Sequence, residues 1–458
     1  MASSSVLAVV LVVLAGWVVA RTRARSTPCD LYCASHNDVI GKNQFNLANL
    51  VRQKVPALST GFSGVWWLPG GNAQTLYTAM GDFTHIDPVV YERRLLQTAD
   101  GGIIAVDISP PIHSHPIQPN ETVVVIAHGL TGGSHEHYVR SMVKKLTPAK
   151  EEGGLGARIV VSNYRGCNGS PVITPRLYNA GSSDDLRVVI LWASQTFPNS
   201  TLLGLGFSLG ANIMTKYTGE EGPACPLTAV VSLANVWDFY KGGQFGNTGT
   251  YENKYFYRYI LGGALRSLLF MHKKVFLEHP DSKITKEVLD ELSRKRKLRL
   301  LEYDNIVQTR MFGFKDAWDY YKKISSLNVL DKIEVPLLGI NALDDPIIGW
   351  KVLPYAQVRR NPWVVLATTS GGGHMGWFEQ GPDGSISRWE SKPTVQFFRA
   401  IMEVKDQFPP RPRPKTIVNS QGFVQQEGSP DVAYREVTPE SIGPVVSGDG
   451  ESKLFSGW

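Results

Sequence analysis

Short, continuous apolar runs recur through the central part of the chain, with helical segments between them. Residues 184–196 and 211–217 have helical periodicity and lie between such runs. A continuous apolar run of this length is typical of a parallel strand that is buried on both faces of a sheet. The alternation predicts an α/β fold with a mostly parallel, doubly wound sheet. Its strands are expected at residues 122–127, 157–162, 201–206, 227–234, 336–342 and 363–369.

One interval in this alternation is much longer than an ordinary connection. About 100 residues separate the strand that ends near Ala234 from the strand that starts near Pro336, whereas most loops in compact domains are only a few residues long. The interval is rich in aromatic residues and ends in a helical segment. We therefore expect a helical lid at about 238–332, inserted in an α/β domain that spans residues 91–408. A hairpin around Asp100-Gly101-Gly102 is expected to open this domain.

Residues 1–25 carry a membrane signal. The segment from Val6 to Ala20 contains no charge and is almost entirely aliphatic, and Arg21, Arg23 and Arg25 follow at once. With the small residues before it, the segment reaches the lower limit for a bilayer span. Positive charges after the apolar run favour an uncleaved single-pass anchor over the alternative, a cleaved signal peptide. The arginines would keep the following domain in the cytosol, at the endoplasmic reticulum or a lipid-droplet surface.

Two further segments flank the expected domain. Residues 26–90 are interpreted as a leader packed on the domain. Residues 409–458 begin with the proline-rich run 409–414 and then become polar. This composition predicts an extended, poorly ordered tail.

The composition excludes some classes of partner. The 458 residues include 47 Lys plus Arg and 41 Asp plus Glu, which gives a formal net charge of +6. So small an excess, without a long basic stripe, does not indicate nucleic acid binding. The four cysteines form no Cys-x-x-Cys pair, so we expect free thiols rather than a zinc site or a disulfide framework. They are Cys29, Cys33, Cys167 and Cys225.

A Gly-x-Ser-x-Gly motif lies between a predicted strand and a predicted helix. It has the sequence Gly206-Phe207-Ser208-Leu209-Gly210. A nucleophile elbow requires this setting, because a sharp strand-to-helix turn with small neighbours exposes the serine. Ser208 is therefore the expected nucleophile. A glycine-rich helix start capped by a serine is the structural alternative.

A glycine-rich loop follows the strand at 122–127 and has the sequence His128-Gly129-Leu130-Thr131-Gly132-Gly133. A loop at this position supplies backbone N–H groups to an oxyanion. The expected donors are the N–H groups of Leu130 and of Leu209, which follows the nucleophile at the positive end of a helix dipole.

The other members of a catalytic triad follow Ser208 in the order acid, then histidine. Asp344 and Asp345 come after the strand at 336–342, and His374 lies in a glycine-rich loop after the last strand. Asp345 is the preferred acid, and Asp344 is the alternative. His374 would take the proton of Ser208, which attacks an acyl carbonyl to form an acyl-enzyme. No metal or organic cofactor is expected.

Taken together, the motifs resemble one branch of the α/β-hydrolase superfamily. This branch includes yeast medium-chain fatty-acid ethyl ester synthase/esterases, a yeast acylglycerol lipase and membrane-anchored abhydrolase-domain phospholipases. The resemblance rests on residues 72–75, 128–134, 163–170, 206–212, 319–321, 341–346 and 372–376.

The resemblance implies an α/β-hydrolase fold and a triad of Ser208, Asp345 and His374. It implies a serine esterase that acts on medium- or long-chain acyl esters, with acyl transfer from acyl-CoA to an alcohol as a further reaction. A monoacylglycerol lipase or phospholipase is the alternative within enzymes. A non-catalytic, membrane-anchored scaffold is the alternative from another class. The expected partners are small acyl substrates and membrane lipid.

Overall fold

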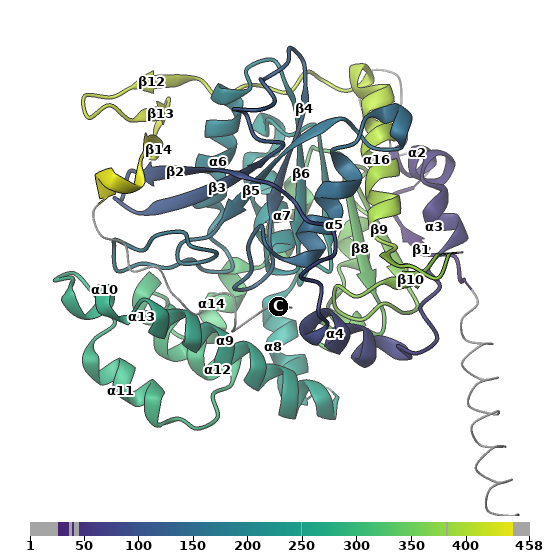
Figure 1. The fold of residues 1–458 in the computed structure, drawn as a ribbon. Coiled ribbons are helices and arrows are strands. Elements are labelled where there is room, and N and C mark those ends of the chain that lie inside the picture. The colour runs from purple at the N-terminus through teal and green to yellow at the C-terminus, as the bar shows by residue number, and fades with distance from the viewer. Residues whose placement is uncertain (1–25, 36–38, 41–44, 249, 382, 443–458) are drawn as a thin grey trace, which may run out of the picture.

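The computed structural model describes residues 26–35, 39–40, 45–248, 250–381 and 383–442. Within these ranges, twelve strands form one sheet through the middle of the molecule (Figure 1). The strand order is β1 (Asp30–Tyr32), β9 (Val364–Thr369), β8 (Leu337–Ala342), β7 (Ala229–Leu233), β6 (Thr201–Phe207), β4 (Thr122–Ala127), β5 (Ala157–Asn163), β3 (Ile103–Ser109), β2 (Glu92–Thr98), β14 (Ser429–Val437), β13 (Val424–Gln426) and β12 (Thr416–Val418). A separate hairpin pairs β10 (Phe378–Gln380) with β11 (Ile386–Arg388).

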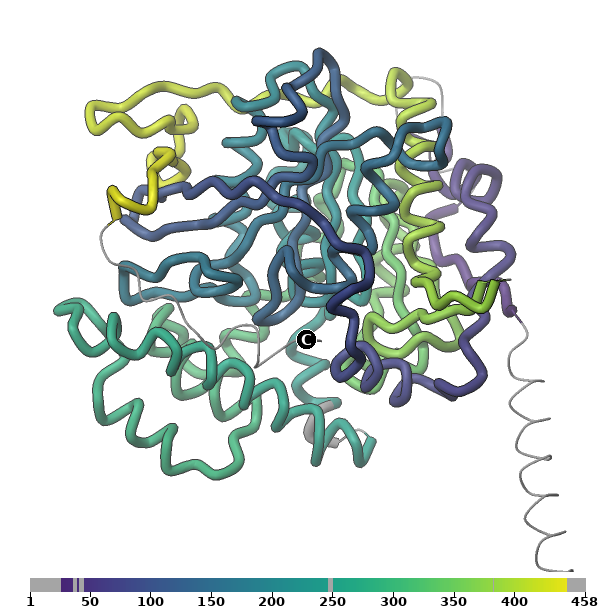
Figure 2. Tube along the Cα trace, in the orientation of Figure 1, coloured from purple at the N-terminus to yellow at the C-terminus, as the bar shows by residue number. Residues whose placement is uncertain are grey.

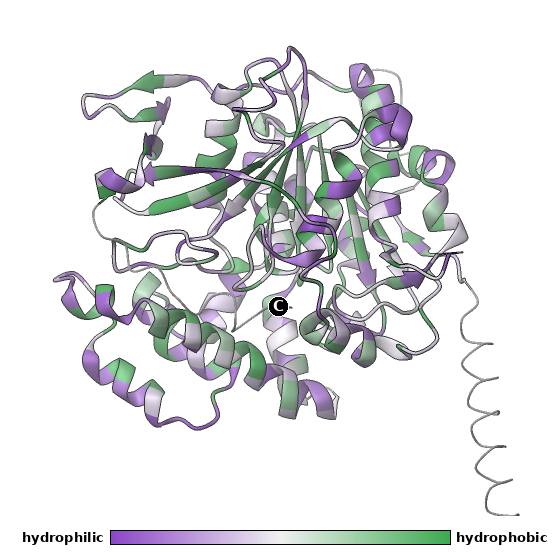
Figure 3. Cartoon of the chain, viewed as in Figure 1, coloured by the Kyte–Doolittle hydropathy of each residue, from purple (hydrophilic) through white to green (hydrophobic). Residues whose placement is uncertain are grey.

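The centre of the sheet is parallel. Strands β5, β4, β6, β7, β8 and β9 run in the same direction. Almost every residue in them is buried, and Figure 3 shows these strands in the hydrophobic colour. The predicted mostly parallel sheet with flanking helices is confirmed. Because the carboxyl ends of parallel strands meet at one edge, the loops after β4, β6, β8 and β9 gather there.

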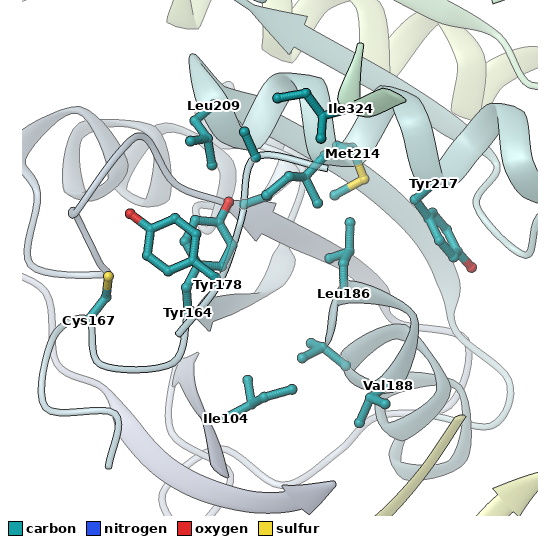
Figure 4. Packing of buried hydrophobic residues seen from close by; sticks show 14 of the residues in the cluster. Ile104, Tyr164, Cys167, Tyr178, Leu186, Val188, Leu209, Met214, Tyr217 and Ile324 are labelled. Atoms are coloured by element: carbon teal, nitrogen blue, oxygen red, sulfur yellow. The ribbon is translucent and has the colours of Figure 1, made fainter. Parts of the chain in front are cut away.

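Helices cover both faces of the sheet. On one face α5, α16 and the small helices α2 and α3 pack together over one hydrophobic cluster, and on the other face α6 and α7 pack over a second cluster. Figure 4 shows part of the second cluster, where Leu186 and Val188 of α6 lie near Met214 and Tyr217 of α7. The bounds are α2 (Leu47–Lys54), α3 (Pro56–Thr60), α5 (His137–Leu146), α6 (Ser183–Thr196), α7 (Leu209–Glu221) and α16 (Ser391–Val404).

A run of helices and short turns fills the interval between β7 and β8 and lies below the sheet in Figure 1. We call this run the lid. Its elements are α8 (Phe239–Thr248), η3 (Asn253–Tyr257), α9 (Arg258–Met271), α10 (Lys273–Glu278), α11 (Lys286–Arg294), α12 (Leu300–Tyr303), η4 (Asp304–Gln308), α13 (Thr309–Phe312), α14 (Ala317–Ile324) and η5 (Ser326–Lys332).

The described part of residues 26–90 contains β1, α2, α3 and α4 (Gly70–Met80). The segment passes along one side of the molecule and then across the edge that faces the lid, as the purple part of the tube shows in Figure 2. β1 pairs with β9, and Val51 and Val55 are fully buried against the body of the protein. The remaining short elements are η1 (Lys150–Glu152), η2 (Gly222–Ala224), η6 (Trp350–Val352), α15 (Tyr355–Val358), η7 (Lys405–Gln407) and η8 (Pro439–Ile442).

Residues 416–437 differ from the poorly ordered tail that their composition predicts. They form β12, β13 and β14, and β14 pairs antiparallel with β2, with Tyr434 opposite Thr98. Ala433 and Tyr434 are buried, and Trp192 of α6 donates a hydrogen bond to Glu436 (2.7 Å). The physical reason is that β2 would otherwise expose an unpaired sheet edge. The proline-rich run covers residues 409–414, and the strands contain one proline, Pro430, next to the first residue of β14.

No helix in the described ranges is both long enough and apolar enough to cross a bilayer. The anchor expected at residues 1–25 lies outside the described residues.

Candidate active site

Ser208 occupies a sharp turn between β6 and α7. Its backbone has φ of 51° and ψ of −115°, a left-handed conformation that is strained for a residue with a side chain. The flanking glycines permit close packing. A Cβ at Gly206 would lie 2.5 Å from Cα of Ala211, and a Cβ at Gly210 would lie 2.2 Å from the carbonyl oxygen of Ala127. The turn therefore holds Ser208 at the carboxyl edge of the sheet, as the motif predicts.

Three side chains from different loops form a hydrogen-bonded chain at this edge. The distance from Ser208 Oγ to His374 Nε2 is 2.8 Å, and the distance from His374 Nδ1 to Asp345 Oδ2 is 2.7 Å. All three side chains are buried. The contact with Asp345 favours a proton on Nδ1, which leaves Nε2 free to accept the proton of Ser208.

The two neighbouring carboxylates have different partners. Asp345 Oδ1 accepts from the N–H groups of Ile347 (2.8 Å) and Ile348 (3.0 Å), while its other oxygen faces His374. Asp344 Oδ1 instead accepts from the N–H of Gly373 (2.8 Å). Burial of Asp344, together with the nearby Asp345 carboxylate, raises its pKa to about 6. The structure therefore pairs Asp345, and not Asp344, with His374.

The loop with Leu130 lies beside the serine and is held by two tyrosines. Tyr138 OH accepts from the N–H of Gly129 (3.0 Å), and Tyr178 OH accepts from the N–H of Thr131 (2.9 Å). Burial raises the pKa of both phenols well above the usual range, so they remain neutral hydroxyls. Figure 4 shows Tyr178 next to Tyr164, with Leu209 close by.

Leu130 lies between Gly129 and Thr131, and its own N–H makes no hydrogen bond within the described part of the chain. The N–H of Leu209, at the start of α7, makes none there either. Both residues line the same cavity as Ser208 and His374. Two free donors beside a nucleophile can stabilise negative charge on a substrate oxygen.

Helix α4 holds the histidine loop, and this role did not follow from the residue pattern. Thr75 Oγ1 accepts from the N–H of His374 (2.8 Å) and donates to the carbonyl of Gly71 (2.7 Å). Gln74 Oε1 accepts from the N–H of Phe378 (2.9 Å), just after the loop. The available signal was the motif at residues 72–75, which carries part of the family resemblance.

The cavity in front of Ser208 runs between the sheet edge and the lid. Its wall is mostly apolar and includes Val236, Phe239, Leu261, Leu265, Leu300 and Ile348. An apolar cavity of this kind, with a few polar groups at the reacting end, is suited to an acyl chain.

The lid also contributes a small polar group to the cavity wall, formed by Arg258, Asp304, Gln308 and Tyr321. Tyr321 OH donates to Asp304 Oδ2 (2.6 Å), and burial raises the pKa of Asp304 to about 7. Gln308 Oε1 has no hydrogen-bond partner among the described residues.

The histidines near the oxyanion loop have other surroundings. His137 Nε2 lies 2.9 Å from the carbonyl of Thr78, and Arg388 contacts the same ring. His135 is partly exposed beside Glu136. In the described ranges, no three His, Cys, Asp or Glu side chains are placed to hold a metal ion.

Known proteins resemble the chain over most of its length. The family model described as "alpha/beta hydrolase fold" matches residues 122–380. A monoacylglycerol lipase of Saccharomyces cerevisiae is 32% identical, over 78% of this chain and 84% of that protein. Medium-chain fatty acid ethyl ester synthase/esterase 2 of the same yeast is 29% identical, over 79% and 91%. Phospholipase ABHD3 of Homo sapiens is 29% identical, over 78% and 83%.

Among solved structures, a Pyrococcus furiosus esterase is similar with a TM-score of 0.40 and 17% identity, over 70% of this chain and 89% of that one.

Proposed function

The chain belongs to the alpha/beta hydrolase family and is an enzyme of the serine esterase or lipase type, and we propose that it hydrolyses medium- or long-chain acyl esters through an acyl-enzyme on Ser208. The observation that carries this proposal is the chain Ser208–His374–Asp345 at the wall of an apolar cavity. The triad supplies a nucleophile and a base, and the cavity supplies room for an acyl chain.

In the proposed reaction, His374 Nε2 takes the proton of Ser208 Oγ as that oxygen attacks the acyl carbonyl carbon. The carbonyl oxygen becomes an oxyanion, which the N–H groups of Leu130 and Leu209 stabilise. Asp345 stabilises the imidazolium through Nδ1–H. The imidazolium then protonates the leaving alcohol, and an acyl ester on Ser208 remains.

The second half-reaction releases the acyl group. His374 removes a proton from a water molecule, which attacks the acyl-enzyme and yields the free acid and the free Ser208 hydroxyl. If an alcohol takes the place of water, the product is a new ester. The two yeast relatives are named as a lipase and as an ester synthase/esterase, so they support hydrolysis and acyl transfer as two outcomes of one site.

The proposed substrates are lipid esters that a membrane presents. The apolar cavity wall supports this class, and so do relatives named as lipases or phospholipases. Acyl-CoA with an alcohol is the second proposed substrate pair.

We further propose the domain division that the sequence predicts. It consists of an anchor at 1–25, a leader at 26–90 and a catalytic domain at 91–408 with its lid.

A fluorophosphonate probe tests the nucleophile. Wild-type protein and the control Ser293→Ala, at an exposed serine of α11, should be labelled equally, whereas Ser208→Ala should not be labelled. Labelling of Ser208→Ala at the wild-type rate would contradict the proposal.

A substrate panel then separates the reactions. Wild type and Ser208→Ala are compared on monoacylglycerol, phosphatidylcholine, ethyl octanoate, and octanoyl-CoA with ethanol. Formation of ethyl octanoate from octanoyl-CoA supports acyl transfer, and its absence at high ethanol limits the enzyme to hydrolysis.

A further inference from the structure

Large apolar side chains are exposed on three segments that border the cavity. They are Trp66, Met80, Tyr251, Tyr255, Phe256 and Trp350, and we call this group the docking face. Met80 is 78% exposed and Tyr251 is 75% exposed. We propose that the docking face seats the enzyme on a lipid bilayer, so that the cavity opens toward the lipid surface. The inference rests on the proposed function in that the substrate is a lipid ester.

Hydrogen bonds join the three segments to one another. Tyr257 OH, at the end of η3, donates to Asn72 Oδ1 of α4 (2.8 Å). Asn253 Nδ2, in the same turn, donates to the carbonyl of Ile347 (2.9 Å) in the loop that leads to Trp350. Figure 1 shows α4 and α8 next to each other below the sheet. The exposed residues therefore belong to segments that are in direct contact with one another.

The same segments form the cavity wall. Thr75 and Ala79 of α4, Leu261 of α9 and Ile347 all line the cavity in front of Ser208. Met80 directly follows Ala79. A flat apolar partner that covered the docking face would therefore lie next to the cavity. An acyl chain must enter this cavity to reach Ser208.

The aromatic and basic residues of the docking face favour a lipid surface. Residues 55–81 contain no charged side chain, and the exposed carboxylates closest in sequence to Met80 and Tyr251 are those of Asp82 and Glu252. Lys254 Nζ lies 5.1 Å from the ring centre of Tyr255, and Lys351 Nζ lies 5.6 Å from that of Trp350. Tryptophan, tyrosine and lysine together are typical of the boundary between hydrocarbon and headgroups, where the rings enter and the ammonium groups meet phosphates.

The start of the described chain lies at the same edge of the sheet. Thr27 Oγ1 and Ser370 Oγ are 2.8 Å apart, and Ser370 follows β9 just before the loop with His374. The sequence before Ser26 contains the uncharged stretch 6–20. An anchor in that stretch, as proposed above, would precede a segment that lies at this edge.

The test compares two substrates with one preparation. The full chain is reconstituted in vesicles of phosphatidylcholine with a minority of phosphatidylserine. Hydrolysis is measured for monoacylglycerol dissolved in the vesicles and for para-nitrophenyl butyrate added to the water phase. The variants are Met80→Asp and Tyr251→Asp, from two segments of the docking face. Val418→Asp is the matched control, because Val418 is 72% exposed on β12, the strand at the far end of the sheet.

We expect each docking-face variant to lose roughly tenfold in rate on vesicle monoacylglycerol, since a carboxylate replaces apolar area that enters the interface. The rate on the soluble ester should stay within about twofold, as for the control on both substrates. In a second measurement, brominated phosphatidylcholine should quench less of the tryptophan emission in Trp66→Phe than in wild type.

Three results would overturn the inference. The first is that the docking-face variants keep the wild-type rate on both substrates. The second is that they lose rate equally on both substrates, which would assign the residues to the cavity instead. The third is a dimer in detergent that Met80→Asp dissociates, which would make the face an interface between two copies. A failure of the proposed function is distinct, because Ser208→Ala would then retain hydrolysis of both esters.

Discussion

Replacing Asp345 with Asn tests the proposed triad at the point where the sequence leaves two candidates. In the wild type, Asp345 Oδ1 accepts two hydrogen bonds from Ile347 and Ile348, and Oδ2 faces His374 Nδ1 at 2.7 Å. In Asp345→Asn, the amide oxygen should keep the two backbone donors. The amide NH2 would then face His374 and donate to Nδ1, so the histidine would carry its proton on Nε2.

A proton on Nε2 of His374 would point at Ser208, so this nitrogen could no longer accept the proton of the Ser208 hydroxyl. An Asp→Asn change of this kind typically lowers kcat by about 10⁴, which corresponds to about 5.5 kcal/mol of the activation free energy. If the new amide of Asp345→Asn flipped, its oxygen would accept from Nδ1–H of His374 again, but its NH2 group would then face the two buried N–H groups of Ile347 and Ile348. Losing those two hydrogen bonds costs about 1–3 kcal/mol each, so the flipped form does not rescue activity.

Asp344→Asn is the matched control, because it makes the same chemical change one residue away. The amide oxygen of Asn can still accept from Gly373, which is the contact that Asp344 makes. We expect a loss of less than about tenfold in kcat/KM, since one neutral hydrogen bond replaces one to a charged group. Both variants are measured with a chromogenic ester, and thermal unfolding is followed to show that each is folded.

The reasoning would be refuted if Asp344→Asn lost more activity than Asp345→Asn. That result would mean that His374 turns toward Asp344 in the working enzyme. Equal, small losses would instead show that neither carboxylate orients the histidine during turnover.

Two further predictions concern Thr75 and Asp304, whose roles the sequence does not predict. Thr75→Val should lower kcat/KM by about tenfold or more, because it removes the acceptor for the N–H of His374, and Thr75→Ser should restore most of the rate. In Asp304→Asn the free energy of unfolding should rise above that of the wild type at pH 8 and match it near pH 4. Burial raises the pKa of Asp304 to about 7 in the folded protein, against about 3.9 in the unfolded chain, so wild-type stability falls between these pH values by up to about 4 kcal/mol. Denaturant titrations at both pH values measure this, and an equal gain at pH 4 and pH 8 would contradict it.

The central sheet could be predicted from the sequence because each of its strands is a short apolar run that can be recognised from its own residues. The apolar runs at 122–127 and 201–206 coincide with β4 and with most of β6. The strand β14 could not be predicted in this way, because its stability depends on pairing with β2, more than 300 residues away. Its apolar residues are few, and they become a strand only beside an open sheet edge.

The site shows the same division between local and distant causes. The position of Ser208 follows from its motif together with the strand directly before it and the helix directly after it. The choice between Asp344 and Asp345 depends on a turn in which Ile347 and Ile348 donate to only one of the two carboxylates. A residue pattern cannot distinguish neighbours in such a turn, because both are acidic and both follow the same strand.

Helix α4 links features that the sequence presents separately. Thr75 holds the backbone of His374, Asn72 accepts from Tyr257 of the lid, and Met80 is exposed at the end of the same helix. A helix that is fixed at the histidine loop and at the lid cannot shift without moving both. The docking face that we propose therefore includes the exposed end of the element that joins the histidine loop to the lid, so a bilayer in contact with this face would lie beside the cavity without touching the triad.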